Sequence, residues 1–260
     1  MRIARFTTGE DPKFGVVEGE PDGTEKIAVI AGDPLYTPIQ FTGERVAVED
    51  ARLLAPVIPR SKVVGIGRNY AAHAAELGHD LPTEPLAFLK PNTSVIGPMD
   101  PIQLPPQSAE VHFEGELAVV IGRICRDVPR ERVAEVVLGY TVANDVTARD
   151  LQNKDGQWWR AKGFDTFCPL GPYLVTGIDP SDLHLVTRRD GEVVQDARTS
   201  SMIFDIPTLV EYVSAVMTLL PGDVILTGTP EGVGPIVAGQ RIEVEIEGIG
   251  TLSNPVVRRP

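Results

Sequence analysis

The sequence contains little cysteine, few aromatic residues and a deficit of basic residues. Only two cysteines, Cys125 and Cys168, occur among 260 residues, too few for a disulfide framework, so a reducing cytoplasm is the expected location. Lysine and arginine together number 24 against 36 acidic residues, which gives a formal net charge of −12. An acidic surface of this kind disfavours nucleic acid and anionic membranes as partners.

Long hydrophobic runs and nucleotide-binding motifs are also missing. No apolar stretch approaches the roughly 18–20 residues of a membrane-spanning helix, and the first residues lack the apolar segment of a signal peptide. The chain contains no P-loop, no complete GxGxxG motif and no regular alternation of strands and helices. We therefore expect neither a secreted or membrane protein nor a nucleotide-binding α/β domain.

Turn-forming residues are abundant. The 25 glycines and 23 prolines predict many short strands joined by turns, hence a β-rich mixed α/β fold. Alternating or continuously apolar stretches predict strands at residues 2–6, 14–18, 26–30, 62–66, 86–89, 111–121, 140–146 and 242–246. Helices are expected at residues 206–220, capped by Asp205, and at 129–138. We place a boundary near residue 57, between a small N-terminal β domain (1–57) and a larger domain (58–260).

Three acidic residues stand out within apolar surroundings. Glu114 and Glu116 are two apart on a predicted strand, so their side chains leave the same face, about 6.6 Å apart along it. Two buried carboxylates need a cation or hydrogen bonds, although a solvated strand end is the simpler explanation of this pair taken alone. Asp145 ends the apolar segment 140–146 and can supply a third oxygen ligand. An all-oxygen site predicts Mg²⁺ or Mn²⁺.

The two central histidines fit other roles better. His112 shares the face of the glutamates but lies about 13 Å along the strand from Glu116, so we expect it to contact a metal ligand or the substrate rather than the metal ion. His184 lies between two leucines and is expected to be structural.

With the acidic residues and the segments around them taken together, the sequence resembles the fumarylacetoacetate hydrolase family over residues 60–257. The resemblance rests on six motifs in the family's order: 67–73 (GRNYAAH), 88–91 (FLKP), 112–117 (HFEGEL), 144–150 (NDVTARD), 162–167 (KGFDTF) and 227–234 (TGTPEGVG). It implies the family's β-roll, a small β domain before it, and a homodimer. It also implies that Glu114, Glu116 and Asp145 bind the metal ion.

The same resemblance assigns roles to further residues. Lys162 matches the family's active-site lysine, which would stabilise developing negative charge. His73 and Glu76, three apart on a predicted short helix, match a His–Glu pair that activates water from a mobile lid. Four residues are expected to contact the substrate: Arg68, Lys90, Gln152 and Thr229.

The predicted function is metal-dependent chemistry on a small 2-oxo acid. The first hypothesis is C–C bond hydrolysis or decarboxylation, of the acylpyruvate hydrolase or oxaloacetate decarboxylase type, through a metal-stabilised enolate. The second is a 2-hydroxyhepta-2,4-diene-1,7-dioate (5-carboxymethyl-2-hydroxymuconate) isomerase or decarboxylase of aromatic catabolism. A third, a non-catalytic metal-binding protein, would have no need of the His–Glu pair.

Overall fold

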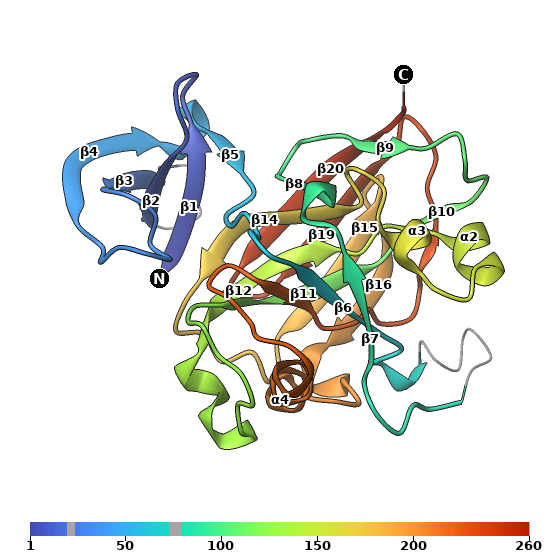
Figure 1. The fold of residues 1–260 in the computed structure, drawn as a ribbon. Coiled ribbons are helices and arrows are strands. Elements are labelled where there is room, and N and C mark those ends of the chain that lie inside the picture. The colour runs from blue at the N-terminus through green and yellow to red at the C-terminus, as the bar shows by residue number, and fades with distance from the viewer. Residues whose placement is uncertain (20–23, 73–79, 260) are drawn as a thin grey trace.

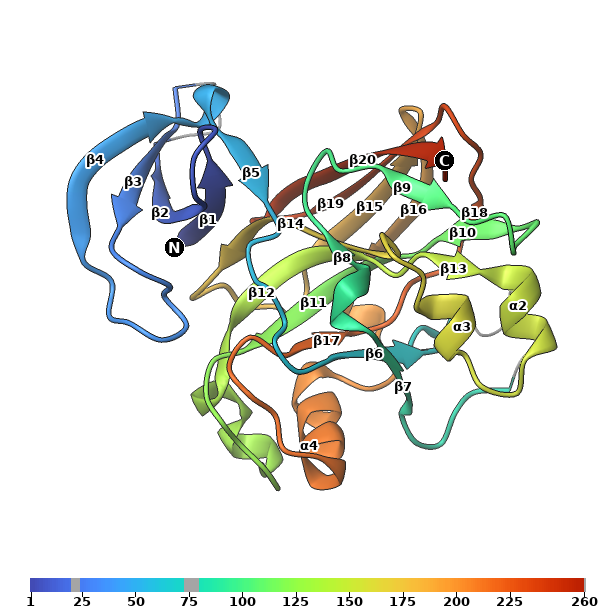
Figure 2. The same ribbon diagram turned by 45° about the horizontal axis from the view of Figure 1, so that its top comes forward.

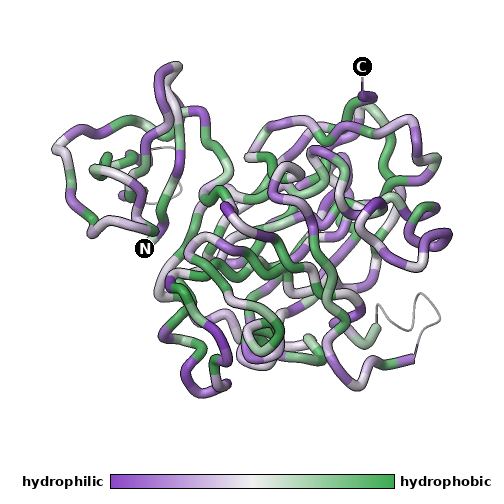
Figure 3. The backbone as a smooth tube through the Cα atoms, viewed as in Figure 1, coloured by the Kyte–Doolittle hydropathy of each residue, from purple (hydrophilic) through white to green (hydrophobic). Residues whose placement is uncertain are grey.

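The fold is known from a computed structural model that describes residues 1–19, 24–72 and 80–259. It is built almost entirely from sheets, with helices at the periphery (Figures 1 and 2). The β-rich architecture expected from the turn content is confirmed. Apolar and polar residues are mixed along the chain (Figure 3). Some strands, such as 241–246, bury every second residue, whereas 115–121 and 168–175 are buried along their whole length.

One large sheet forms the centre of the molecule. Its strands follow the order β4-β3-β2-β1-β14-β12-β11-β17-β6-β7, with β5 paired to β1 and β8 to β14. Most of its pairs are antiparallel, but β17 pairs with β6, and β14 with β8, in parallel. The strands are β1 (Arg2–Thr7), β2 (Lys13–Glu18), β3 (Lys26–Ile30), β4 (Phe41–Ala47), β5 (Arg52–Leu54), β6 (Val63–Gly67), β7 (Leu86–Lys90), β8 (Val95–Ile96), β11 (Gly115–Ile121), β12 (Val137–Asn144), β14 (Cys168–Val175) and β17 (Val224–Leu226).

Two smaller sheets flank the large one. A five-stranded sheet has the order β16-β15-β19-β20-β9, and a three-stranded sheet has the order β13-β10-β18. Their strands are β9 (Ile102–Leu104), β10 (Val111–Phe113), β13 (Thr147–Ala148), β15 (His184–Arg189), β16 (Glu192–Arg198), β18 (Gly234–Pro235), β19 (Arg241–Ile246) and β20 (Gly250–Arg258). The predicted alternation in 242–246 is confirmed, since every second residue of β19 is buried.

The helices are short. Those that lie wholly within the described ranges are α2 (Arg149–Lys154), α3 (Trp159–Lys162) and α4 (Ile206–Val216), with 3₁₀ turns at Val48–Asp50, Asn92–Ser94, Arg130–Glu135 and Thr199–Ser201. Asp205 caps α4 as predicted, because its carboxylate accepts a hydrogen bond from the Thr208 amide. No helix in the described ranges is long and apolar enough to cross a membrane.

Two predicted elements differ from the structure. The predicted strand 111–121 is interrupted at Glu114, so that β10 joins the small sheet and β11 the large one. The break is held by side chains, since the amides of Glu114 and Gly115 donate to Asn144 and Gln195 rather than to a neighbouring strand. The predicted helix 129–138 is a 3₁₀ turn, because the chain already enters β12 at Val137.

The N-terminal strands are hydrogen-bonded to the rest of the molecule. Strand β1 pairs with β14, with Ile3 opposite Leu174, so the large sheet is continuous across residue 57. Ile3, Ala55 and Val57 also belong to a buried cluster that contains residues of β11 and β17. The division into domains 1–57 and 58–260 stays a prediction.

Candidate metal centre and active site

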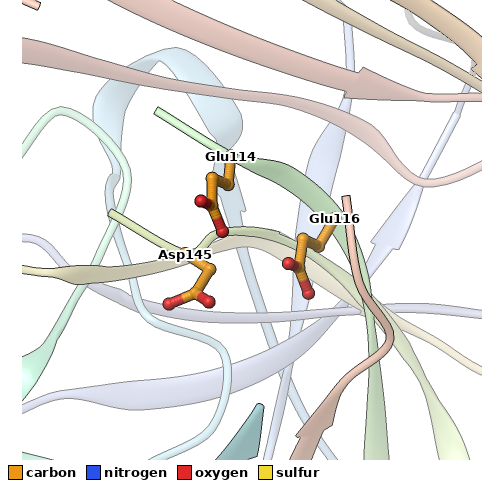
Figure 4. Close-up of side chains that lie close together, drawn as sticks. All are labelled: Glu114, Glu116 and Asp145. Atoms are coloured by element: carbon orange, nitrogen blue, oxygen red, sulfur yellow. The ribbon is translucent and has the colours of Figure 1, made fainter. Parts of the chain in front are cut away.

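Three carboxylates lie together at the start of β11 and the end of β12. Glu114 links β10 to β11, Glu116 is the second residue of β11, and Asp145 directly follows β12. The two strands are neighbours, and the Asp145 amide donates to the Glu114 carbonyl at 2.8 Å. One carboxylate oxygen from each residue lies within 4.8 Å of the others (Figure 4). The structure therefore brings together the three acids predicted to bind a metal ion.

These carboxylates are almost completely shielded from solvent. Glu114 is 4% exposed, and Glu116 and Asp145 are 1% exposed. Burial, and then the charges of Asp145 and Glu114, raise the pKa of Glu116 well above its usual value. The Gly228 amide, which donates to Glu116 Oε2 at 2.8 Å, opposes this rise only in part. A cation would relieve the repulsion among the three acids.

Lys162 bridges two of the three acids. Its Nζ lies 2.7 Å from Glu114 Oε2 and 2.5 Å from Asp145 Oδ2, and the residue is 2% exposed. Burial alone would lower the pKa of this lysine, but the charges of Asp145 and Glu114 outweigh that effect and raise it. The ring of Phe88 lies 4.9 Å from the ammonium and adds a cation–π contact.

Arg149 also contacts the cluster, although the sequence analysis did not single it out. As the first residue of α2 it is nearly buried, and its guanidinium donates to Glu114 Oε1 and to the side-chain oxygen of Gln152. Its Nε also points to His112, at 3.4 Å. The signal that could have identified Arg149 is its place in the 144–150 motif, four residues after Asp145.

His112 lies to the side of the carboxylate cluster. Its Nε2 is 2.8 Å from Glu110 Oε1, and burial together with the charge of Arg149 lowers the pKa of the imidazole. His184 is partly exposed and pairs with Asp196 at 2.6 Å.

Lys90 contacts Asp145 but, in the described part of the chain, does not line the cavity next to the acids. Its Nζ is 2.5 Å from Asp145 Oδ1, its side chain is fully buried, and it comes from the end of β7. This placement favours a role in holding Asp145 over the predicted contact with the substrate.

Thr229 is held beside the site by hydrogen bonds through Gln195, a residue that the sequence analysis did not single out. Gln195 Nε2 donates to Thr229 Oγ1 at 2.8 Å, while Gln195 Oε1 accepts from the Gly115 amide at 3.0 Å. Gly228 must be glycine, since its φ is +99° and a Cβ there would lie 2.7 Å from the Asn69 Cβ. Close approach of these segments fixes both Thr229 and the Gly228 amide.

A cavity of about 500 Å³ opens onto the carboxylates. Most of the predicted site residues within the described ranges line it, together with residues that were not predicted. The lining residues are Ile66, Gly67, Arg68, Glu110, His112, Glu114, Glu116, Arg149, Gln152, Asn153, Trp158, Lys162 and Thr229. The site thus combines a polar floor with an apolar wall of Ile66, Gly67 and Trp158.

Comparison with known proteins identifies the family. Residues 62–257 match the family model described as fumarylacetoacetate (FAA) hydrolase C-terminal, and residues 1–56 match one described as Rv2993c-like, N-terminal. The chain belongs to the fumarylacetoacetate hydrolase family. The predicted resemblance is confirmed.

Relatives within the fumarylacetoacetate hydrolase family have several names. A solved structure from Mycobacterium smegmatis, named 5-carboxymethyl-2-hydroxymuconate delta-isomerase, is 56% identical, covers 100% of both chains and superposes with a TM-score of 0.92. The rat protein named oxaloacetate tautomerase Fahd2a, mitochondrial, is 40% identical over 99% of this chain and 92% of its own length. The Dictyostelium discoideum protein named oxaloacetate decarboxylase, mitochondrial, is 44% identical over 73% of this chain and 90% of its own. The predicted fold type is confirmed by the structural match.

The donor set of this fumarylacetoacetate hydrolase family member fits a hard divalent cation. All three side chains offer oxygen and none offers sulfur or nitrogen, and the pKa of Glu116 stays raised although Lys162 lies nearby, so a further cation could be accommodated at Glu116. The predicted pair His73 and Glu76 lies outside the described residues, so its position relative to the cavity stays a prediction.

Proposed function

We propose that this protein is a divalent-metal-dependent enzyme that decarboxylates or hydrolyses a small 2-oxo acid through its enolate. The observation that carries the proposal is the buried set of Glu114, Glu116 and Asp145, with the Lys162 ammonium against two of them, at the base of a cavity of about 500 Å³. A divalent cation held there, Mg²⁺ or Mn²⁺, would draw electron density from the 2-oxo group of the substrate.

The protein's own groups would bind and orient the substrate. Thr229 Oγ1 accepts from Gln195, so its hydroxyl proton is left to donate to a substrate oxygen. Gln152 accepts from Arg149 through its side-chain oxygen, so its amide N–H groups are likewise available to the cavity. Arg149 meanwhile fixes the orientation of Glu114.

Lys162 would stabilise the charge that develops when the bond at C3 breaks. Its ammonium is fixed by two acids, and such preorganised charges lower barriers more effectively than mobile ones. In decarboxylation the departing group is CO₂ and the enolate is then protonated. In hydrolysis a water must attack the acyl carbon, and we assign its activation to His73 and Glu76.

Isomerisation or tautomerisation is the second candidate. It is favoured by the 56% identity to the structure named 5-carboxymethyl-2-hydroxymuconate delta-isomerase and by the relative named oxaloacetate tautomerase. Both reactions pass through an enol, so the same carboxylates and lysine would serve them. The two candidates differ in the bond that breaks, and therefore in the products.

A substrate panel tests the proposal. The metal-stripped protein is assayed with oxaloacetate, acylpyruvates, fumarylpyruvate and the heptadienedioate, before and after addition of Mg²⁺ or Mn²⁺. We expect metal-dependent release of CO₂ or of a carboxylic acid, whereas isomerisation of the heptadienedioate or ketonisation of oxaloacetate alone would select the second candidate. Full activity in metal-free protein, verified by elemental analysis, would contradict both.

Glu116→Gln provides the matched variant. The change keeps the shape of the side chain and an acceptor for the Gly228 amide but removes one of three anionic ligands, so Mn²⁺ affinity measured by titration should fall at least about tenfold. Glu110→Gln is the control, because Glu110 lines the same cavity but lies outside the carboxylate cluster. Equal Mn²⁺ affinity of the two variants would place the metal elsewhere.

Assembly and location stay predictions. A homodimer is expected and is checked by light scattering on the purified protein. A cytoplasmic location is expected from the cysteine content.

A further inference from the structure

Arg68 is a cavity cation without a partner. Three basic side chains line the cavity, and two of them, Arg149 and Lys162, are held by Glu114. Among the residues that the structure describes, Arg68 forms neither a hydrogen bond nor an ion pair. It follows β6 directly and is only partly exposed. Its guanidinium is therefore the one lining cation in the described ranges that gives none of its donors to the protein.

The backbone at Arg68 is held in an unusual conformation. Its φ is +58°, a left-handed value that is uncommon for a residue with a side chain. Both neighbours are fixed, since Gly67 pairs with Leu86 and the Asn69 side chain makes hydrogen bonds to Phe204 and Thr227. Strain of this kind persists only where the surrounding structure enforces it, and it gives Arg68 a defined place on the cavity wall.

The other two lining cations are already paired with an acid. Arg149 and Lys162 contact Glu114, at the place where the 2-oxo acid end of the substrate would bind. Arg68 lines the same cavity but does not contact the carboxylates, so its positive charge is left for a second negative group on the substrate. A dicarboxylate supplies such a group.

We infer that Arg68 binds the second carboxylate of a dicarboxylic 2-oxo acid and thereby selects dicarboxylates over monocarboxylates. The inference rests on the proposed function, in which the 2-oxo acid end of the substrate lies at Glu114, Glu116 and Asp145. Arginine suits this task, because its planar guanidinium can donate two parallel hydrogen bonds to a carboxylate. Arg68 is accordingly a specificity-determining residue for the distal end of the substrate.

The experiment compares acids of equal length. Isothermal titration of the Mg²⁺-loaded protein measures the affinity for 2-oxoglutarate against 2-oxopentanoate, and for 2-oxoadipate against 2-oxohexanoate. A hydrogen-bonded charge pair in a cavity predicts a preference of about 10–100-fold for the dicarboxylate in at least one of the two pairs. Arg68→Gln should remove that preference and leave the monocarboxylate affinity within about threefold, and Arg68→Lys should retain part of it.

Arg123→Gln is the matched control, since Arg123 is exposed and does not line this cavity. It removes the same charge from the molecule and should keep the full preference. Equal affinities within both pairs for the unchanged protein, or an Arg68→Gln variant that keeps the preference, would overturn the inference while Mg²⁺-dependent binding still supports the proposed function. If no 2-oxo acid binds in an Mg²⁺-dependent manner, the proposed function fails and the inference fails with it.

Discussion

Lys162 is charged and buried, and the cost of burying it is offset by its partners. An isolated ammonium transferred into the protein interior loses several kcal/mol of hydration free energy. The ion pairs with Glu114 and Asp145, at 2.7 and 2.5 Å, offset much of that lost free energy and reduce the repulsion between the two acids. A lysine held in this way cannot swing freely, so its charge stays fixed beside the place where negative charge would develop.

Lys162→Met tests this role directly. The substitution keeps the apolar stem and removes the charge, so kcat at saturating substrate should fall by roughly 10²–10³, as when other preorganised electrostatic contacts are removed. Circular dichroism should show an unchanged fold. Lys162→Arg should recover little activity, because a planar guanidinium places its donors differently from an ammonium. A change in KM alone would show that Lys162 binds substrate and transition state equally.

Strand β6 has two glycines that make room for aromatic rings. Gly65 lies opposite Phe88 on β7, and a Cβ at Gly65 would come within 2.3 Å of the Phe88 ring. A Cβ at Gly67 would lie 2.8 Å from Trp158. The Trp158 ring packs edge-on against the Phe88 ring, with 5.5 Å between the ring centroids. Phe88 in turn lies against the Lys162 ammonium. The glycines therefore position Lys162 indirectly, through the aromatic pair.

Gly65→Ala should disturb both stability and catalysis. The added methyl group must displace the Phe88 ring, and overpacking of this kind typically costs about 1–3 kcal/mol of unfolding free energy. We expect a lower denaturation midpoint in urea and a reduced kcat. Gly156→Ala is the control, because a Cβ there meets nothing within 4 Å and its φ is not positive. Gly65→Ala with the stability and kcat of the unchanged protein would show that the Phe88 ring can move without affecting Lys162.

These glycines show where sequence reasoning stops. The strand predicted at 62–66 is found as β6, but the sequence did not show that its glycines make room for rings from other segments. Patterns within one segment, such as the alternation in β19 or the cap at Asp205, were predictable because they depend on neighbours in the chain. Arg149 and Gln195 were not recognised, because their partners lie 35 and 80 residues away and only the fold brings them together.

Strand β11 connects the site to the core of the whole molecule. All of its residues are buried, and they alternate between two clusters, with Leu117, Val119 and Ile121 in one and Ala118 and Val120 in the other. Because the strand that carries Glu116 is packed on both faces, its position is strongly determined. The second cluster is completed by residues from the N-terminal segment, which therefore supports the sheet that carries Glu116.

Ile3→Ala measures how tightly the N-terminal segment is coupled to that sheet. Ile3 is 1% exposed and lies on β1 opposite Leu174 of β14, so truncation leaves a cavity and should cost about 2–5 kcal/mol of unfolding free energy. Since the large sheet is continuous from β4 to β7, the whole protein should unfold in one transition at a lower Tm, observed by calorimetry. Ile39→Ala, at a position 36% exposed in the same segment, should shift Tm far less. Two separate transitions, of which Ile3→Ala shifts only the first, would instead show that residues 1–57 unfold independently and that the carboxylate site does not depend on them.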